Sequence, residues 1–258
     1  MTAPLGATSL PGRTALVTGG GNGLGAAIAR ALHGAGADVV VAGRRTGPLA
    51  RLCDELGERA SWRACDVTEP GSVAELADSL SDVEVSVVVN NAGVAGPVAP
   101  LTEISVEEWD EVFAVNVRGM FLVCRALLPP MVQRGRGDVI NVASVSGKRP
   151  LVRRTPYAAS KMAVIGLTST LAFEVGPAGV NVNSLSPGPV AGPRMDRNFT
   201  LEAARTGTSY AEAEQAFVSR SALGRMVTEE EVGAAAVAML AMPGLCGSDV
   251  DLSAGMVA

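Results

Sequence analysis

The chain has 258 residues, a formal net charge of −5 and a sequence pI near 5.1. This length is enough for one domain that buries roughly 70–75% of its unfolded surface, and the acidic balance argues against nucleic acid as the main partner. No apolar run reaches the ~18 residues that a membrane span requires. The first twelve residues lack a basic region followed by an apolar stretch, so we expect no signal peptide and a cytoplasmic protein.

The cysteines and the single histidine do not form a metal-binding pattern. Cys53, Cys65, Cys124 and Cys246 show no C-x-x-C spacing, and His33 has no second histidine to join it. We interpret the cysteines as small, mostly apolar residues of a protein in a reducing compartment. No metal ligand is expected.

Short β-branched runs alternate with helical stretches along the chain, with no linker or repeat between them. Aromatic residues are only 3% of the chain, so aliphatic side chains must fill the core, which favours a parallel sheet covered on both faces. The alternation predicts an α/β fold of the Rossmann type, doubly wound and mainly parallel. We expect one domain over residues 12–258 after a flexible tail over residues 1–11. Seven strands are expected, at residues 14–18, 39–42, 62–66, 86–90, 139–142, 180–185 and 250–252.

Three helix starts can be read from the sequence. A serine or threonine followed three residues later by glutamate predicts a capping box at Ser105 and at Thr228. A third helix is expected to begin with Thr155 as its N-cap and Pro156 in its first turn.

A glycine-rich loop follows the first predicted strand and leads into a helix. Glycine lets the backbone approach a pyrophosphate without an intervening side chain, and the helix start offers unpaired N–H groups and a positive dipole end. Such a loop can be a simple turn, but its place between a strand and a helix near the start of the chain favours dinucleotide binding. The expected contacts are Gly19, Gly21, Asn22, Gly23, Leu24 and Gly25.

The end of the second strand bears on the choice of dinucleotide. An acidic residue there would hydrogen-bond the ribose 2′-hydroxyl of NAD, but this chain has Arg44 and Arg45. Two guanidinium groups suit the 2′-phosphate of NADP, which arginine can bind bidentately. The alternative is that both are solvated loop charges, and Asn22 is neutral where another phosphate-binding cation could stand. NADP is the expected cofactor, with NAD as the alternative.

A tyrosine and a lysine at helical spacing supply the candidate chemistry. Tyr157 and Lys161 lie one turn apart, so they project from the same helix face. An ammonium beside a phenol favours the phenolate and makes the phenol usable as an acid or base. Most tyrosine–lysine pairs at this spacing are exposed surface residues without a catalytic role. Ser144 and the other motifs upstream favour a catalytic role for this pair.

Together these motifs resemble the short-chain dehydrogenase/reductase family in its compact single-domain form. The resemblance runs from about residue 12 to the C-terminus. It rests on the glycine-rich loop and on Asp66-Val67, Asn90-Asn91-Ala92-Gly93, Asn116, Ser144, Tyr157 with Lys161, and Pro187-Gly188. It implies hydride transfer between a nicotinamide cofactor, which the two arginines predict to be NADP(H), and a secondary alcohol or ketone.

The resemblance also implies a role for each of four catalytic residues. Tyr157 would be the acid/base, Ser144 would orient the substrate oxygen, and Lys161 would hold the nicotinamide ribose. Asn116 would anchor a water that links Lys161 to solvent; the alternative is an asparagine satisfied by its own helix. Tyr157 and Lys161 count as cofactor contacts as well.

The remaining cofactor contacts follow from the same resemblance. For the contacts at the adenine and its ribose, the alternative is a purely structural role at the end of the central strand. Family members often carry a threonine a few positions beyond Pro-Gly, where this chain has Gly192-Pro193-Arg194, so the carboxamide contact would fall to backbone groups. The implied contacts are Asp66 and Val67 at the adenine, Asn90, Ala92 and Gly93 under the ribose, and Pro187, Gly188 and Val190 at the nicotinamide.

Charge is the only feature of the sequence that indicates what kind of substrate is bound. Residues 148–154 should rim the cleft, and residues 193–223 are expected to form a mobile lid. The cations of these segments could attract an anionic substrate, and the alternative is a solvated rim or a subunit contact. A homotetramer is expected from the family and from the apolar ending at residues 254–258. The cations are Lys148, Arg149, Arg153, Arg154, Arg194 and Arg197.

Two functional alternatives remain open. One is the same reaction with NAD(H), and the other is a non-catalytic dinucleotide-binding regulatory protein. The complete set of Asn116, Ser144, Tyr157 and Lys161 counts against a regulator. A sugar epimerase or dehydratase of the longer relatives would need a second substrate domain, which 258 residues do not accommodate.

Overall fold

The structure is a computed structural model, and it describes residues 9–256 apart from the side chains of Pro193 and Arg194. Most of the flexible tail expected over residues 1–11 lies outside the described residues. Leu10 is described and buried, and its backbone N–H donates to the Ala35 carbonyl oxygen at 2.7 Å. The last two residues of the expected apolar ending, Val257 and Ala258, also lie outside the described residues.

Within the described residues, seven parallel strands form one sheet in the order β3-β2-β1-β4-β5-β6-β7. The chain winds outward from β1 in both directions, so the order reverses between β1 and β4. This arrangement confirms the predicted Rossmann-type fold. The strands are β1 (Thr14–Thr18), β2 (Asp38–Gly43), β3 (Ala60–Ala64), β4 (Val85–Asn90), β5 (Gly137–Val142), β6 (Val180–Pro187) and β7 (Asp249–Leu252).

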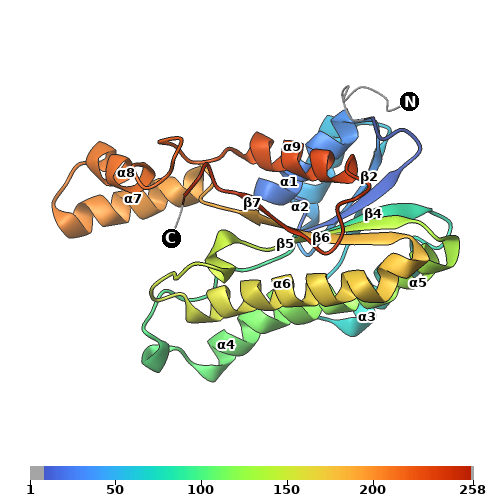
Figure 1. Cartoon of the computed structure of the whole chain (residues 1–258), viewed down its shortest axis with the longest axis horizontal. Coiled ribbons are helices and arrows are strands. Elements are labelled where there is room, and N and C mark those ends of the chain that lie inside the picture. Colours follow the sequence, from blue (N-terminus) through green and yellow to red (C-terminus); the bar gives the residue numbers. More distant parts are fainter. Residues whose placement is uncertain (1–8, 257–258) are drawn as a thin grey trace.

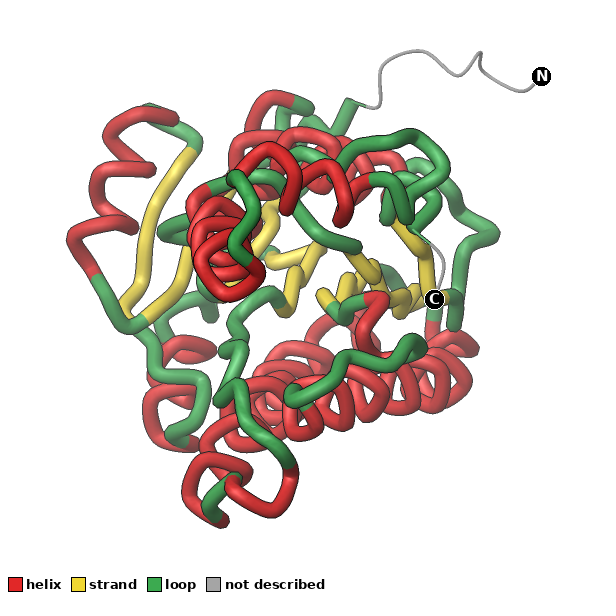
Figure 2. The backbone as a smooth tube through the Cα atoms, turned by 90° about the vertical axis from the view of Figure 1, so that its left-hand side faces the viewer, coloured by secondary structure: helices red, strands yellow, loops and turns green. Residues whose placement is uncertain are grey.

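Helices cover both faces of the sheet (Figure 1). One layer contains α1 (Gly23–Gly34), α2 (Thr46–Leu56) and α9 (Glu229–Leu240), and the other contains α3 (Pro70–Asp78), α4 (Val106–Phe113), α5 (Met120–Arg134) and α6 (Thr155–Val175). Figure 2 shows the strands enclosed between these two layers.

Alternate residues of a strand pack into the hydrophobic cores on opposite faces of the sheet. In β2, Val39 and Val41 pack in the cluster with α1, α2 and α9, whereas Val40 packs in the cluster with α3, α5 and α6. Successive side chains of a strand point to opposite faces, so a strand covered on both sides must be apolar throughout. This requirement explains the β-branched runs of the inner strands β2 and β4.

Two long helical stretches, Val106–Arg134 and Thr155–Ala178, are apolar enough to cross a membrane by length and composition alone. Neither stretch is an uninterrupted apolar run, because charged residues such as Arg118 and Arg125 in the first and Lys161 in the second interrupt them. Both stretches contribute side chains to the core beneath the sheet, including Val123, Met131 and Val164. Core helices of a doubly wound protein are apolar for that reason.

Helix and strand boundaries differ from expectation at two places near the site. The third strand ends at Ala64, so Asp66 follows the strand instead of closing it. The helix α6 starts with Arg154 at the N-cap position and Thr155 as its first residue, without a side-chain cap. The capping boxes predicted at Ser105 and Thr228 are both present.

The helices α7 (Pro193–Thr206) and α8 (Tyr210–Val218) form a hairpin that projects from the end of the sheet (Figure 1). Phe199 of α7 and Val218 of α8 form a small hydrophobic cluster with Met226, which lies between α8 and α9. The hairpin occupies most of the segment predicted as a lid.

Candidate active site

Most of the predicted site residues line one cavity of about 990 Å³. The cavity lies where the loops after β1 to β6 meet, at the edge of the sheet formed by the carboxyl ends of its strands. Of the predicted catalytic and cofactor-binding residues, only Asn90 and Asn116 are absent from its described lining. The predicted residues that line it are Gly19, Gly21, Asn22, Gly23, Leu24, Gly25, Arg44, Arg45, Asp66, Val67, Ala92, Gly93, Ser144, Tyr157, Lys161, Pro187, Gly188 and Val190.

The glycine-rich loop is folded tightly against its neighbours. A Cβ at Gly25 would lie 2.3 Å from the Gly19 carbonyl oxygen, and Gly23 has a φ of +52°. The following helix α1 has Asn22 at its N-cap, without a side-chain cap or an acidic first turn among the described residues. Its first N–H groups therefore face the cavity with a positive dipole end, which fits the pyrophosphate of a dinucleotide.

Two arginines stand beside this loop with different partners. The Arg44 Nη1 lies 3.8 Å from Asp66 Oδ2, and the Arg44 side chain is 62% exposed. With the Asn22 amide oriented to satisfy both of its neighbours, its oxygen accepts from Arg45 Nη2 at 3.1 Å and its nitrogen donates to the Gly21 carbonyl oxygen at 3.0 Å. Both guanidinium groups thus lie at the nucleotide end of the cavity.

Asp66 is held as a carboxylate. Its Oδ1 accepts from the Thr68 backbone N–H at 2.9 Å and from the Thr68 hydroxyl at 2.8 Å. Partial burial acts to raise the pKa of Asp66, but these hydrogen bonds and the charge of Arg44 lower it overall. The carboxylate can accept hydrogen bonds from an amino group that enters the cavity.

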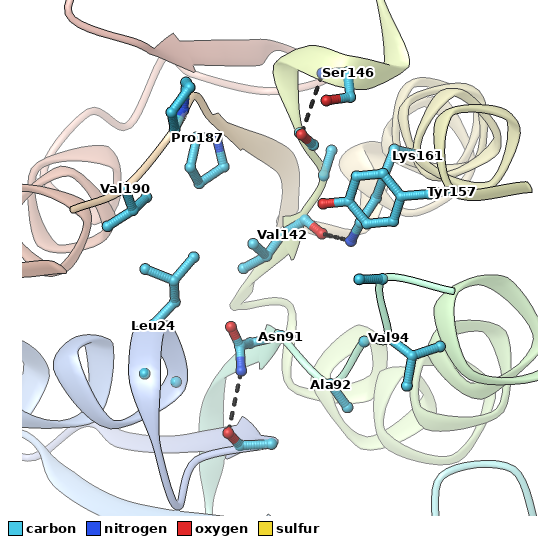
Figure 3. A pocket seen from close by; sticks show the side chains of 18 of the residues that line it. Leu24, Asn91, Ala92, Val94, Val142, Ser146, Tyr157, Lys161, Pro187 and Val190 are labelled. Carbon is cyan, nitrogen blue, oxygen red and sulfur yellow. Dashed lines mark hydrogen bonds between the residues drawn. The ribbon is translucent and has the colours of Figure 1, made fainter. Parts of the chain in front are cut away.

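The loop after β4 is fastened to the end of β1 by Asn91, a lining residue that was quoted in the motif but not predicted as a contact. Its Nδ2 donates to the Thr18 carbonyl oxygen at 3.0 Å, and its backbone N–H donates to Thr18 Oγ1 at 3.1 Å. Figure 3 shows the Asn91 side chain beside Leu24 at this end of the cavity, with Ala92 on the side of Val94. These bonds fix the floor of the nucleotide end.

Asn90 points away from the cavity. Its side chain is buried, and its Nδ2 donates to Asn141 Oδ1 at 2.9 Å and lies 3.2 Å from Cys124 Sγ. Burial raises the pKa of the Cys124 thiol to about 12. The side chain of Asn90 thus joins β4 to β5 within the core, which is the structural role weighed above.

The candidate catalytic side chains converge at the middle of the cavity. Lys161 is buried, and its Nζ donates to the Val142 carbonyl oxygen at 2.8 Å and lies 5.8 Å from the centroid of the Tyr157 ring. Ser144 Oγ accepts from the Ser146 backbone N–H at 3.1 Å, which fixes the oxygen and leaves the hydroxyl hydrogen to donate elsewhere. In Figure 3 the Tyr157 hydroxyl points into the open space, between Lys161 on one side and Pro187 across the cavity.

Asn116 lies in a π-helical turn (Ala114–Gly119) between α4 and α5. Its Oδ1 accepts from the Val94 backbone N–H at 2.8 Å, and its Nδ2 donates to the Val94 carbonyl oxygen and to Ser160 Oγ, each at 3.0 Å. The side chain therefore ties the loop after β4 to α6. A Cβ at Gly93 would lie 3.2 Å from Asn116 Oδ1 and 3.7 Å from Lys161 Nζ, so Asn116 stands just behind the cavity wall.

The structure separates the cations that were expected to rim the substrate end. Lys148 forms ion pairs with Asp249 and Asp251; partial burial lowers its pKa, but the two hydrogen-bonded carboxylates raise it overall. Arg149 contacts Asp251 at 3.5 Å and lines the cavity. Arg154 lines it as well.

Three of the expected cations, Lys148, Arg153 and Arg197, do not belong to the described lining of the cavity. Arg153 donates to the Val98 carbonyl oxygen at 3.4 Å. The side chain of Arg194 is outside the described residues. The α7–α8 hairpin and the segment just after it contribute lining residues that the sequence did not single out, namely Met195, Asn198, Phe217 and Arg220, and Met256 joins them near the C-terminus.

The fold and the cavity together define a class of protein. A doubly wound parallel sheet carries, in one cleft at its carboxyl edge, a glycine-rich loop before a helix and a tyrosine–lysine pair. Residues 13–203 match the family model described as short chain dehydrogenase. The chain belongs to the short-chain dehydrogenase family, and it is an oxidoreductase that acts on alcohol or ketone groups with a nicotinamide dinucleotide.

Relatives and solved structures agree with this assignment. The chain is 39% identical to D-threitol dehydrogenase of Mycolicibacterium smegmatis over 183 residues, which is 69% of this chain and 70% of the relative. Actinorhodin polyketide ketoreductase with NADPH superposes with a TM-score of 0.87 at 32% identity, covering 95% of this chain and 97% of that one. Xylitol dehydrogenase with NAD⁺ gives a TM-score of 0.88 at 27% identity, covering 95% and 99%.

Proposed function

We propose that the protein is an NADP(H)-dependent carbonyl reductase or secondary-alcohol dehydrogenase in which Tyr157 is the acid/base. One observation carries the proposal: the Tyr157 hydroxyl points into the same cavity that the glycine-rich loop lines, with the Lys161 ammonium 5.8 Å from the tyrosine ring. A nucleotide bound along the loop would meet a proton donor at the middle of the cavity.

Each side chain near the tyrosine has a chemical task in this proposal. The bound cofactor supplies or accepts a hydride at the carbon of the substrate. Tyr157 donates its phenolic proton to the carbonyl oxygen during reduction and removes the hydroxyl proton during oxidation. The Lys161 charge stabilises the phenolate that remains, and the Ser144 hydroxyl donates a hydrogen bond to the oxygen where negative charge develops.

Arg44 and Arg45 support NADP(H) over NAD(H). Both line the nucleotide end, and Arg45 is oriented across the loop by the Asn22 amide oxygen. A 2′-phosphate at this place would receive charge-assisted hydrogen bonds. Solved relatives are bound to NADPH in one case and to NAD⁺ in another, so NAD(H) is the competing cofactor.

The proposal is tested with a panel of secondary alcohols and ketones, monitored at the absorbance of the reduced nicotinamide with each cofactor. We expect turnover with NADPH and a lower Kd for NADPH than for NADH in fluorescence titrations. Tighter binding of NADH would contradict the cofactor assignment. Cofactor binding without turnover of any alcohol or ketone would instead favour a regulatory protein.

We also propose that the protein is a homotetramer with a closing lid. Phe121, Met162 and Phe173 on α5 and α6 are 47%, 47% and 85% exposed, which is apolar area that a second copy could cover. Met195 and Phe217 bring the α7–α8 hairpin to the cavity wall, as a lid requires. Light scattering that gives the mass of a monomer would contradict the assembly.

A further inference from the structure

The substrate end of the cavity is positively charged and apolar. Its described lining includes Arg149, Arg154 and Arg220, whereas the two acidic lining residues, Asp66 and Glu229, stand at the nucleotide end. Asp66 lies beside Arg44, and Glu229 lies near Gly23 and Gly192. Apolar side chains complete the substrate end, among them Leu151, Met195, Phe217 and Met256.

The three arginines are not equivalent. Arg149 already contacts the Asp251 carboxylate and the Met256 carbonyl oxygen, so part of its charge is offset by the protein. Arg220 follows the lid helix α8, is exposed, and places its guanidinium carbon 5.9 Å from the centroid of the Phe217 ring. Arg154 belongs to the body of the protein, immediately before the helix that carries Tyr157.

Arg154 is held beside the Tyr157 ring. Its guanidinium carbon lies 5.9 Å from the centroid of the Tyr157 ring, which is nearly the distance of Lys161 Nζ from the same centroid. Its Nη1 donates to the carbonyl oxygens of Gly96 and Pro97 at 3.2 and 3.5 Å, and these bonds fasten the guanidinium to the loop after β4. A ligand group bound to Arg154 would therefore sit close to an oxygen bound by Tyr157.

We propose that Arg154 is a specificity-determining residue that binds the carboxylate of an oxo acid, with the carboxylate one or two carbons from the reacting carbonyl. The planar guanidinium matches a carboxylate bidentately, whereas a neutral ketone would gain nothing from it. Arg220 adds a second cation from the lid side, and the apolar lining accepts the carbon chain. The inference rests on the proposed function and makes its substrate class more specific; carboxylate binding itself breaks and forms no covalent bond.

The test compares straight-chain 3-oxo acids with their methyl esters, which share the carbon skeleton and differ in charge. With NADPH and the full-length protein, we expect the acids to have the higher kcat/KM, falling as ionic strength rises. Arg154→Met should lower kcat/KM for the acids by about 10- to 100-fold, while the esters change by less than about threefold. Arg220→Met should lower the value for the acids by a smaller factor.

A matched control separates a local contact from a general charge effect. Arg153→Met removes the same charge from the neighbouring residue, which does not line the cavity, and should leave the preference for acids unchanged. An unchanged Kd for NADPH in Arg154→Met shows that the variant is folded. If that variant does not fold, Arg220→Met and the salt dependence of the wild type carry the test.

The outcomes distinguish this inference from the proposed function. Esters or neutral ketones turned over as well as acids, without salt dependence, would overturn the carboxylate site and leave the carbonyl reductase intact. Equal losses for acids and esters in Arg154→Met would also overturn it. Failure to reduce any carbonyl compound would overturn the proposed function, and the carboxylate site with it.

Discussion

The strongest prediction about the nucleotide end concerns Arg45→Ala. Arg45 lines the cavity and is held by the Asn22 amide oxygen at 3.1 Å, whereas Arg44 is 62% exposed and shares its charge with Asp66 at 3.8 Å. A hydrogen bond to a charged group contributes about 1.5–3 kcal/mol. Because 1.4 kcal/mol corresponds to a factor of ten, the Kd for NADPH should rise by about 10- to 100-fold. Solvent exposure places the expected value toward the lower end of that range.

Fluorescence titration of the reduced cofactors measures this effect directly. The Kd for NADH should change by less than about threefold, because NADH lacks the 2′-phosphate. Arg51→Ala is the matched control, since Arg51 is an exposed arginine of α2 that does not line the cavity. Equal weakening of NADPH and NADH in Arg45→Ala, or no weakening of either, would refute the assignment of the phosphate contact.

Three further predictions concern stability and the loop. Gly25→Ala places a methyl group 2.3 Å from a backbone oxygen of the loop; it should destabilise the protein by about 1–3 kcal/mol in urea unfolding and weaken both cofactors, and unchanged values would contradict the tight turn. Arg13→Met removes an ion pair with Asp138, in which the two side chains are 2.7 Å apart and 25% and 19% exposed. The free energy of unfolding should fall by about 1–3 kcal/mol, and this loss should be smaller at high salt. The hydrogen bond from Arg225 lowers the pKa of Glu231 from 4.5 to about 2, so this carboxylate stabilises the fold above pH 4.5 and loses that effect as pH falls toward 2. Glu231→Gln should make the urea midpoint of unfolding less dependent on pH between pH 4.5 and 2. An unchanged pH dependence would contradict the stabilising role of the Arg225–Glu231 ion pair.

Features set by neighbours in the chain could be read from the sequence. The inner strands β2 and β4 follow from β-branched runs, because a strand covered on both faces favours apolar side chains at successive positions. The capping boxes at Ser105 and Thr228 depend on residues only three positions away. The glycine-rich loop likewise lies between a strand and a helix that are both adjacent to it.

Features set by distant residues could not be read in the same way. The pairing of Lys148 depends on Asp249 and Asp251, about a hundred positions later, so nothing near residue 148 reveals that its charge is offset. Phe217 and Arg220 reach the cavity only through the path of the α7–α8 hairpin.

Asn90, the last residue of β4, and Asn91, the residue after it, carry a signal that the sequence offered. Successive residues of a strand point to opposite faces, so Asn90 and Asn91 cannot both face the same space. The structure turns Asn90 into the core and Asn91 toward the cavity. The alternation predicts that only one of the two asparagines lines the cavity. Asn90 faces Cys124 of α5 in the core, so Asn91 is the lining residue.

Tyr157→Phe tests the central claim most directly, because it removes one oxygen from the cavity and leaves the ring in place. The measurement is the rate of NADPH oxidation with the best carbonyl substrate, together with the Kd for NADPH. Turnover should fall by about 10²- to 10⁴-fold while the Kd stays within about threefold. A variant that keeps wild-type turnover, or that loses turnover only in proportion to lost cofactor binding, would contradict the role of the tyrosine as acid/base.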